Sequence, residues 1–166
     1  MTDLTFRRDQ PWGEIVLKWW HGLADDTGGR ATLRRASDLT AVALAPAYQR
    51  LYRRLRAAGW PDEPWQNDRL AAVAGLLAHV RELDADTLPI AMSRRDGDKP
   101  RVSPLRFRRL LESPDVDALF TGLRRTLPLL QQRADPLALA TDVLAWGDKV
   151  RKRWAYAYDW PESKSA

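Results

Sequence analysis

The fold is decided by residues 68–83, which read Asp68-Arg69-Leu70-Ala71-Ala72-Val73-Ala74-Gly75-Leu76-Leu77-Ala78-His79-Val80-Arg81-Glu82-Leu83. Between Leu70 and Val80 nearly every side chain is apolar, and only a thin polar edge is left. A helix that is apolar almost all round needs cover on every side, so such helices lie at the centre of a protein. We therefore expect residues 68–83 to form a central helix around which the other elements wrap.

Signals for helix starts lie on both sides of this segment. Proline, which favours the first helical position, marks starts at Pro11 and Pro46. A capping side chain followed by proline marks three more, at Ser103-Pro104, Ser113-Pro114 and Asp135-Pro136. The first helix should end at residues 25–29, and further helices are expected over 38–45, 46–58, 104–112, 114–126 and 136–158. Residues 88–92 suggest one helical turn, residues 28–37 a loop or short irregular helix, and residues 93–100 a solvated loop.

The apolar alternation that is typical of strands is nearly absent from the chain. We therefore expect an all-α fold, a compact single-domain helical bundle with about seven to nine helices and no sheet. The helical domain is expected over residues 11–160, preceded by an N-terminal arm over 1–10 and followed by a C-terminal tail over 161–166.

Composition excludes several classes of protein. The chain has 166 residues, no Cys and two His, with 27 Lys and Arg against 22 Asp and Glu, for a formal net charge of +5. The lack of Cys excludes disulfides, thiolate metal sites and a thiol nucleophile, and two histidines are too few for a His-rich metal site. No apolar run reaches the ~18 residues of a membrane-spanning helix, and no signal peptide is recognisable. We expect a cytoplasmic protein without a membrane partner.

No motif suggests a reaction. Phosphate-binding glycine loops and the serine-nucleophile motif are missing, and Asp96-Gly97-Asp98 lacks the other ligands of a calcium loop. His21 and His79 are both interpreted as surface histidines, because neither has a Cys, Asp or Glu at ligand spacing. The sequence therefore predicts a non-enzymatic protein with no catalytic residue, no metal and no cofactor.

The cations are mostly arginines, whose planar guanidinium matches phosphate oxygens with two hydrogen bonds. They gather in three segments that carry little negative charge. The clusters are Arg30, Arg34 and Arg35; Arg101, Arg106, Arg108 and Arg109; and Lys149, Arg151, Lys152 and Arg153. A charged outer face is also the ordinary solvated side of an amphipathic helix. If folding brings the clusters together, however, they form a surface that binds phosphate groups.

The same segments carry a resemblance. Gly29-Arg30-Ala31-Thr32-Leu33-Arg34-Arg35-Ala36 resembles the N-terminal arginine loop of the CasB family, the small subunit of Cascade, the type I-E CRISPR surveillance complex. The segment from Pro100 to Leu111 resembles the central motif of that family, and the segment from Asp142 to Tyr156 resembles its C-terminal motif. The similarity extends over about residues 11–160, with the motifs in the same order.

This resemblance implies an all-α, non-catalytic subunit that takes part in antiviral defence. Family members assemble in more than one copy beside other Cascade subunits, contact the backbone of guide RNA and target DNA, and help to hold the displaced strand without reading its sequence. The residues that match the motifs and would contact nucleic acid are Arg30, Arg34, Arg35, Arg101, Arg106, Arg108, Arg109, Lys149, Arg151, Lys152 and Arg153.

Two other functions are compatible with these residues. A structural adaptor could use its basic faces to bind acidic protein partners. A stand-alone helical DNA-binding regulator would instead need a recognition helix repeated in a dimer, and no helix-turn-helix spacing is evident.

Overall fold

The computed structural model describes residues 5–162, so residues 1–4 of the expected arm and 163–166 of the expected tail lie outside the described residues. The helices are α1 (Pro11–Gly22), α2 (Thr27–Arg35), α3 (Leu39–Ala43), α4 (Pro46–Ala57), α5 (Pro64–Leu77), α6 (Leu88–Ser93), α7 (Pro104–Leu111), α8 (Val116–Thr126), the 3-10 helix η1 (Leu127–Leu130), α9 (Pro136–Leu144) and α10 (Asp148–Ala157). Within the described range there are thus ten α-helices, slightly more than the sequence predicts.

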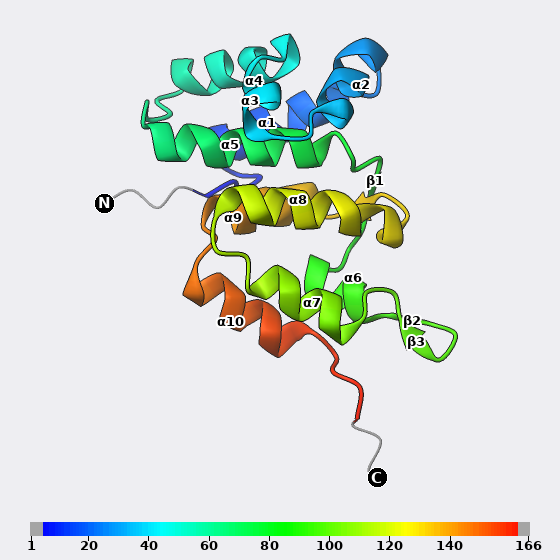
Figure 1. Ribbon diagram of the computed structural model, residues 1–166. Coiled ribbons are helices and arrows are strands. Elements are labelled where there is room, and N and C mark those ends of the chain that lie inside the picture. Colours follow the sequence, from blue (N-terminus) through cyan, green and yellow to red (C-terminus); the bar gives the residue numbers. More distant parts are fainter. Residues whose placement is uncertain (1–4, 163–166) are drawn as a thin grey trace.

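The central position of α5 confirms the main prediction from the sequence. Every residue from Leu70 to Leu77 is buried, and α5 packs against α3 and α4 on one side and α8 and α9 on the other. Figure 1 shows α2 to α4 on one side of α5, with α8 and α9 beyond it and α6, α7 and α10 in the outermost layer, while α1 contacts both α4 and α9. Close packing depends on Gly75, because an added Cβ would lie 2.8 Å from the ring of Phe120 in α8.

The predicted bounds of this helix are wrong at both ends. It begins at Pro64, which takes the favoured first position, and it stops at Leu77. The residues that follow turn away and pair with another segment, since the backbone N–H of Arg81 donates to the carbonyl oxygen of Gln132 at 2.8 Å. Backbone bonds to residues 132–134 therefore replace helical bonds in this part of the chain.

The prediction of no sheet is also wrong. β1 (Glu82–Leu83) pairs in parallel with β4 (Arg133–Ala134), and β2 (Arg95–Asp96) pairs antiparallel with β3 (Lys99–Pro100). Each strand has two residues, which is too short for the apolar alternation by which strands are recognised. The sequence predicts a solvated loop over residues 93–100, but β2 and β3 make a hairpin of the last six of them. Gly97 turns the chain between the two strands with a φ of 68°.

Three other local predictions need correction. Residues 27–35 form the regular helix α2, because the Asp26 carboxylate caps it by accepting from the backbone N–H of Gly29. The single helix expected over 136–158 is two helices, interrupted at residues 145–147, where Gly147 is fully extended. The helix expected from Pro114 begins at Val116, since Asp115 caps it through the N–H of Ala118.

The outer layer is joined by aromatic packing. The rings of Phe107 in α7 and Tyr158, directly after α10, stack with centroids 4.2 Å apart. The Tyr158 hydroxyl donates to the carbonyl oxygen of Val102 at 2.7 Å, so its buried polar group is satisfied. These contacts hold α7 and α10 together and leave the other side of α7 facing α8.

Candidate functional site

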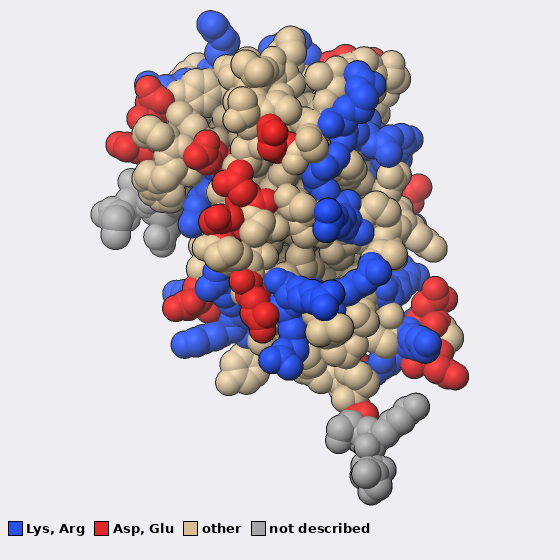
Figure 2. Space-filling model, viewed as in Figure 1, with Lys and Arg blue, Asp and Glu red and all other residues tan. Residues whose placement is uncertain are grey.

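Basic side chains of three helices lie along one face of the molecule. Figure 2 shows blue side chains in a band that runs from the region of α2, across α8, to the region of α7, while most red side chains of this view lie to either side. Two of the three clusters found in the sequence, those of α2 and α7, thus lie on the same face. The helix between them, α8, supplies Arg124 and Arg125 in its last turn.

Arg124 connects α8 directly to α2. Its Nη2 donates to the main-chain carbonyl oxygen of Arg34 at 3.0 Å, and its guanidinium lies over the ring of Phe120 at 5.8 Å from the centroid. The carbonyl of Arg34 belongs to the last turn of α2, where helical carbonyls lack partners within the helix. The bond therefore satisfies α2 and fixes the distance between the two basic helices.

A groove of about 420 Å³ separates α7 from α8. Its lining includes the guanidinium-bearing side chains of Arg106, Arg109 and Arg125, all exposed, and one carboxylate, that of Glu112. The Oε1 atom of Glu112 lies 3.9 Å from Nη2 of Arg108, so this carboxylate also faces a fourth arginine. The groove is therefore concave and carries net positive charge.

A glycine allows this crossing of α7 and α8. A Cβ at Gly122 would lie 2.6 Å from a methyl group of Leu110, so α7 can approach α8 only because that position has no side chain. Leu110 and Gly122 both line the groove, and its width is thus determined by their contact.

A second, smaller concavity of about 170 Å³ lies at the α2 end of the band, and Arg30, Arg34 and Arg81 line it. The Arg30 guanidinium donates to the carbonyl oxygens of Ala78 at 3.0 Å and Val80 at 2.6 Å. Burial, and then the charges of Arg81 and Arg34, lower the pKa of Arg30. The fold therefore gathers like charges here.

His79 is buried, with a relative exposure of 8%, so its interpretation as a surface histidine is wrong. It follows α5 by two residues, and α2 and α8 both pack against that helix. Burial, followed by the positive charges of Arg124, Arg34 and Arg30, lowers its pKa to about 4. Its Nε2 has no hydrogen-bond partner within the described residues. The imidazole is thus neutral at pH 7.

The third sequence cluster lies on α10 and contributes differently. Lys149 and Lys152 are exposed, whereas the charge of Arg153 is offset by the buried carboxylate of Asp142, which also raises the pKa of Arg153. Arg151 donates to the carbonyl oxygen of Ser113 at 2.7 Å and lies over the Trp146 ring. Ser113 lines the groove, so this hydrogen bond connects α10 to a residue of the groove wall.

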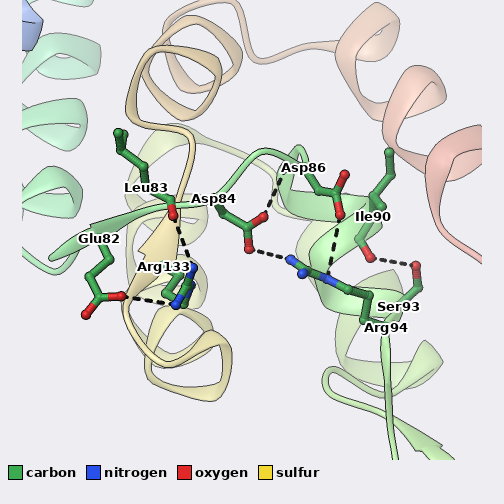
Figure 3. Close-up of polar contacts among 8 residues, drawn as sticks. All are labelled: Glu82, Leu83, Asp84, Asp86, Ile90, Ser93, Arg94 and Arg133. Atoms are coloured by element: carbon green, nitrogen blue, oxygen red, sulfur yellow. Dashed lines mark hydrogen bonds and ion pairs between the residues drawn. The ribbon is translucent and has the colours of Figure 1, made fainter.

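The remaining predicted residues flank the band. Arg35 is exposed at the end of α2, and Arg101 is half-buried between β3 and α7. Its backbone N–H donates to the carbonyl oxygen of Arg94. The side chain of Arg94 itself pairs with Asp84 and Asp86, and that of Arg133 pairs with Glu82 at 3.0 Å, as Figure 3 shows. Arg94 and Arg133 are therefore neutralised by acids.

Sequence reasoning missed Arg81, Arg124 and Arg125. A signal was present for the last two, because no carboxylate occurs between Asp117 and Asp135. Arg81 is followed by Glu82, which hides its role in the sequence; in the structure Glu82 instead pairs with Arg133.

Neither a membrane-spanning helix nor a metal-binding group occurs among the described residues. Over residues 5–162, no helix has both the length and the apolar character needed to cross a membrane. In the same range, no three side chains of His, Cys, Asp or Glu form a group that could hold a metal ion.

Comparisons with known proteins point to one family. The family model described as CRISPR-associated protein Cse2 matches residues 29–158. A chain of the crystal structure of E. coli Cascade bound to a PAM-containing dsDNA target has a similar fold, with a TM-score of 0.63 and 24% sequence identity. The match covers 87% of this chain and 92% of that chain. No curated protein matches the sequence.

Proposed function

The chain belongs to the CRISPR-associated Cse2 family, which is the CasB family of type I-E Cascade, and we propose that it acts as a nucleic-acid-clamping subunit of such a complex. In this role it contacts the backbone of guide RNA and target DNA and stabilises the displaced strand. Its partners are the other Cascade subunits, further copies of itself and the nucleic acids. It catalyses no reaction, and it works in the cytoplasm.

The physical basis of this role is the small free-energy difference between the closed DNA duplex and the state opened by the guide RNA. When a guide RNA opens a duplex, the new heteroduplex is about as stable as the DNA duplex that it replaces. Modest contacts to the displaced backbone therefore shift the balance toward the open state. Such contacts need no base recognition, because the guide supplies the sequence specificity.

The observation that carries the proposal is the α7–α8 groove. Arg106, Arg109 and Arg125 line one concave surface, and only Glu112 among the lining residues carries a negative charge. Arginine side chains that are exposed yet close to one another favour the repeating phosphates of a strand, since each contact releases condensed counterions. Arg124 extends this surface to α2, which adds Arg30, Arg34 and Arg35.

The other predicted residues take secondary positions in this proposal. Arg101 and Arg108 flank the groove beside α7, and Lys149, Arg151 and Lys152 extend the contact toward α10. Arg153 contributes less, because its charge is already balanced by Asp142. The exposed side chains of Leu105 and Tyr156, on α7 and α10, offer apolar contacts to neighbouring subunits.

Reconstitution of the complex tests the proposal. A Cascade assembled with the variant Arg106→Gln/Arg109→Gln should form normally but release opened target DNA faster than the complex with the natural chain. A variant with Arg53→Gln and Arg54→Gln, exposed arginines of α4, serves as the control of equal charge. Normal retention of DNA together with defective assembly would overturn the proposal and favour the structural adaptor.

A further inference from the structure

The concavity at the α2 end of the band has the features of a built anion site. It is lined by Leu23, Ala24, Thr27, Arg30, Ala31, Arg34 and Arg81, and thus by three guanidinium groups and no carboxylate. Within the described residues, none of these three arginines takes part in an ion pair. Like charges held together without a counter-charge destabilise a fold, so an external anion would relieve this repulsion.

The position of Arg30 is fixed before any ligand arrives. Two of its nitrogens donate to the carbonyl oxygens of Ala78 and Val80, which hold the plane of the guanidinium and leave Nη1 without a protein partner in the described structure. A guanidinium whose orientation is already determined loses little freedom on binding.

A second arginine of the pocket also has an unsatisfied donor. The Nε atom of Arg34, which lines the pocket, is buried and has no hydrogen-bond partner within residues 5–162. Buried donors normally have partners, and each exception calls for an explanation. A tetrahedral oxyanion offers several acceptors in different directions, which suits donors that converge from α2 and from the segment after α5.

We propose that this pocket, formed by Arg30, Arg34 and Arg81, is a specific site for one phosphate group. A volume of about 170 Å³ admits a phosphate with some water but not a nucleotide base and sugar together. The inference deepens the proposed function, because a phosphate of the bound nucleic acid is one source of the ligand. A free phosphate ion is the other source, and both present the same chemistry.

His79 provides an internal reporter for the site. The charged groups that face it are Arg30 and Arg34 of α2 and Arg124 of α8. An anion bound to two of these arginines offsets their effect on the imidazole, so phosphate should raise the pKa of His79, by about one unit. His21, the second histidine, is exposed on α1 and serves as the control within the same molecule.

The experiment is an NMR titration of both imidazoles in the full chain, in which sodium chloride is replaced by inorganic phosphate at constant ionic strength. We expect a saturable rise for His79 and none for His21. Arg81→Gln, which removes an exposed side chain that makes no hydrogen bond within residues 5–162, should weaken phosphate binding at least about tenfold. Arg53→Gln should leave it unchanged. Equal responses of His79 and His21, or equal affinity of Arg81→Gln and the natural chain, would overturn the site.

A second titration distinguishes the two sources. A hexathymidylate without terminal phosphates that reproduces the His79 shift identifies a backbone phosphodiester as the ligand. A shift with inorganic phosphate alone identifies a free phosphate ion, and the site stands in either case. Loss of DNA retention in Arg106→Gln/Arg109→Gln is measured separately, so failure of the pocket and failure of the proposed function give different results.

Discussion

Arg124 in α8 donates a hydrogen bond to the main-chain carbonyl oxygen of Arg34 in α2, across 90 residues of sequence. This hydrogen bond joins α2 and α8, two of the three helices that carry the basic side chains of the band. It also uses the guanidinium of Arg124 for structure, while the adjacent Arg125 stays exposed in the groove. Neighbouring arginines in the same helical turn therefore have separable roles.

That separation predicts opposite outcomes for matched substitutions. Arg124→Met replaces the guanidinium by an unbranched apolar side chain and so loses the hydrogen bond to the Arg34 carbonyl. It should lower the free energy of unfolding by about 1–2 kcal/mol. Arg125→Met should change stability by less than about 0.5 kcal/mol and should weaken binding of single-stranded DNA. Urea unfolding and filter binding check the pair. Equal stability of the two variants would contradict the role of the Arg124 bond.

The ion pair between Asp142 and Arg153 is another contact in which an arginine has a structural role. Its buried carboxylate accepts from Trp154 Nε1 at 2.8 Å and pairs with Arg153, which connects α9 to α10. We expect Asp142→Asn to lower the free energy of unfolding by about 1–3 kcal/mol, because an amide cannot accept from both donors through two oxygens. Asp148→Asn removes an exposed partner of Arg151 and should cost less than about 1 kcal/mol. Thermal unfolding of both variants measures the difference.

The burial of His79 predicts a specific dependence on pH. Its pKa is about 4 in the folded chain and 6.5 ordinarily, so between these values the unfolded chain binds a proton that the folded chain does not. Stability should therefore fall as the pH drops from 6.5 to 4 and lose no more from this group below that range. The lowered pKa values of Asp62 and Asp84 act at lower pH, below 3.8.

Comparison with His79→Gln isolates this contribution. In urea unfolding at pH 7, 5.5 and 4.5, the variant should lose less stability than the natural chain, because it lacks the imidazole whose pKa is lowered by folding. Parallel losses in the two chains would show that His79 takes up its proton in the folded state as readily as in the unfolded one.

Glycines at two helical positions should respond differently to the same substitution. Gly75→Ala places a methyl group 2.8 Å from the Phe120 ring in the centre of the protein and should cost about 1–3 kcal/mol. At Gly22, at the end of α1, a Cβ meets nothing within 4 Å, so Gly22→Ala should be neutral or stabilise by up to about 1 kcal/mol. Calorimetric melting temperatures distinguish the two cases, and a neutral Gly75→Ala would contradict the tight α5–α8 packing.

The sequence predicts the helical class and the central helix because apolar residues around Leu70–Leu77 leave no polar face. It also predicts helix starts such as Ser103-Pro104, since capping is local chemistry. It could not predict where α5 ends, because residues 81–84 leave the helix to pair with residues 132–134, a long-range contact. The burial of His79 was hidden for the same reason: the helices that cover it are distant in sequence.

The candidate site follows the same rule. The basic clusters at residues 30–35 and 101–109 are visible in the sequence, but their position on one face depends on α8, which lies between them. In the sequence, α8 shows only two adjacent arginines, Arg124 and Arg125. For Arg153 the sequence is misleading, because its partner Asp142 lies in a different helix. Charge density is readable from a sequence, whereas the neutralisation of each charge is a property of the packed structure.

The salt dependence of single-stranded DNA binding by the isolated chain tests the central claim most directly. The logarithm of the binding constant should fall against the logarithm of salt concentration with a slope of about −0.7 for each phosphate contacted. In Arg106→Gln/Arg109→Gln/Arg125→Gln the slope should be less steep by about 2, whereas Arg8→Gln/Arg53→Gln/Arg54→Gln, with the same loss of charge at exposed positions elsewhere, should keep the natural slope. A flat salt response of the natural chain, or the same slope in both variants, would contradict the account.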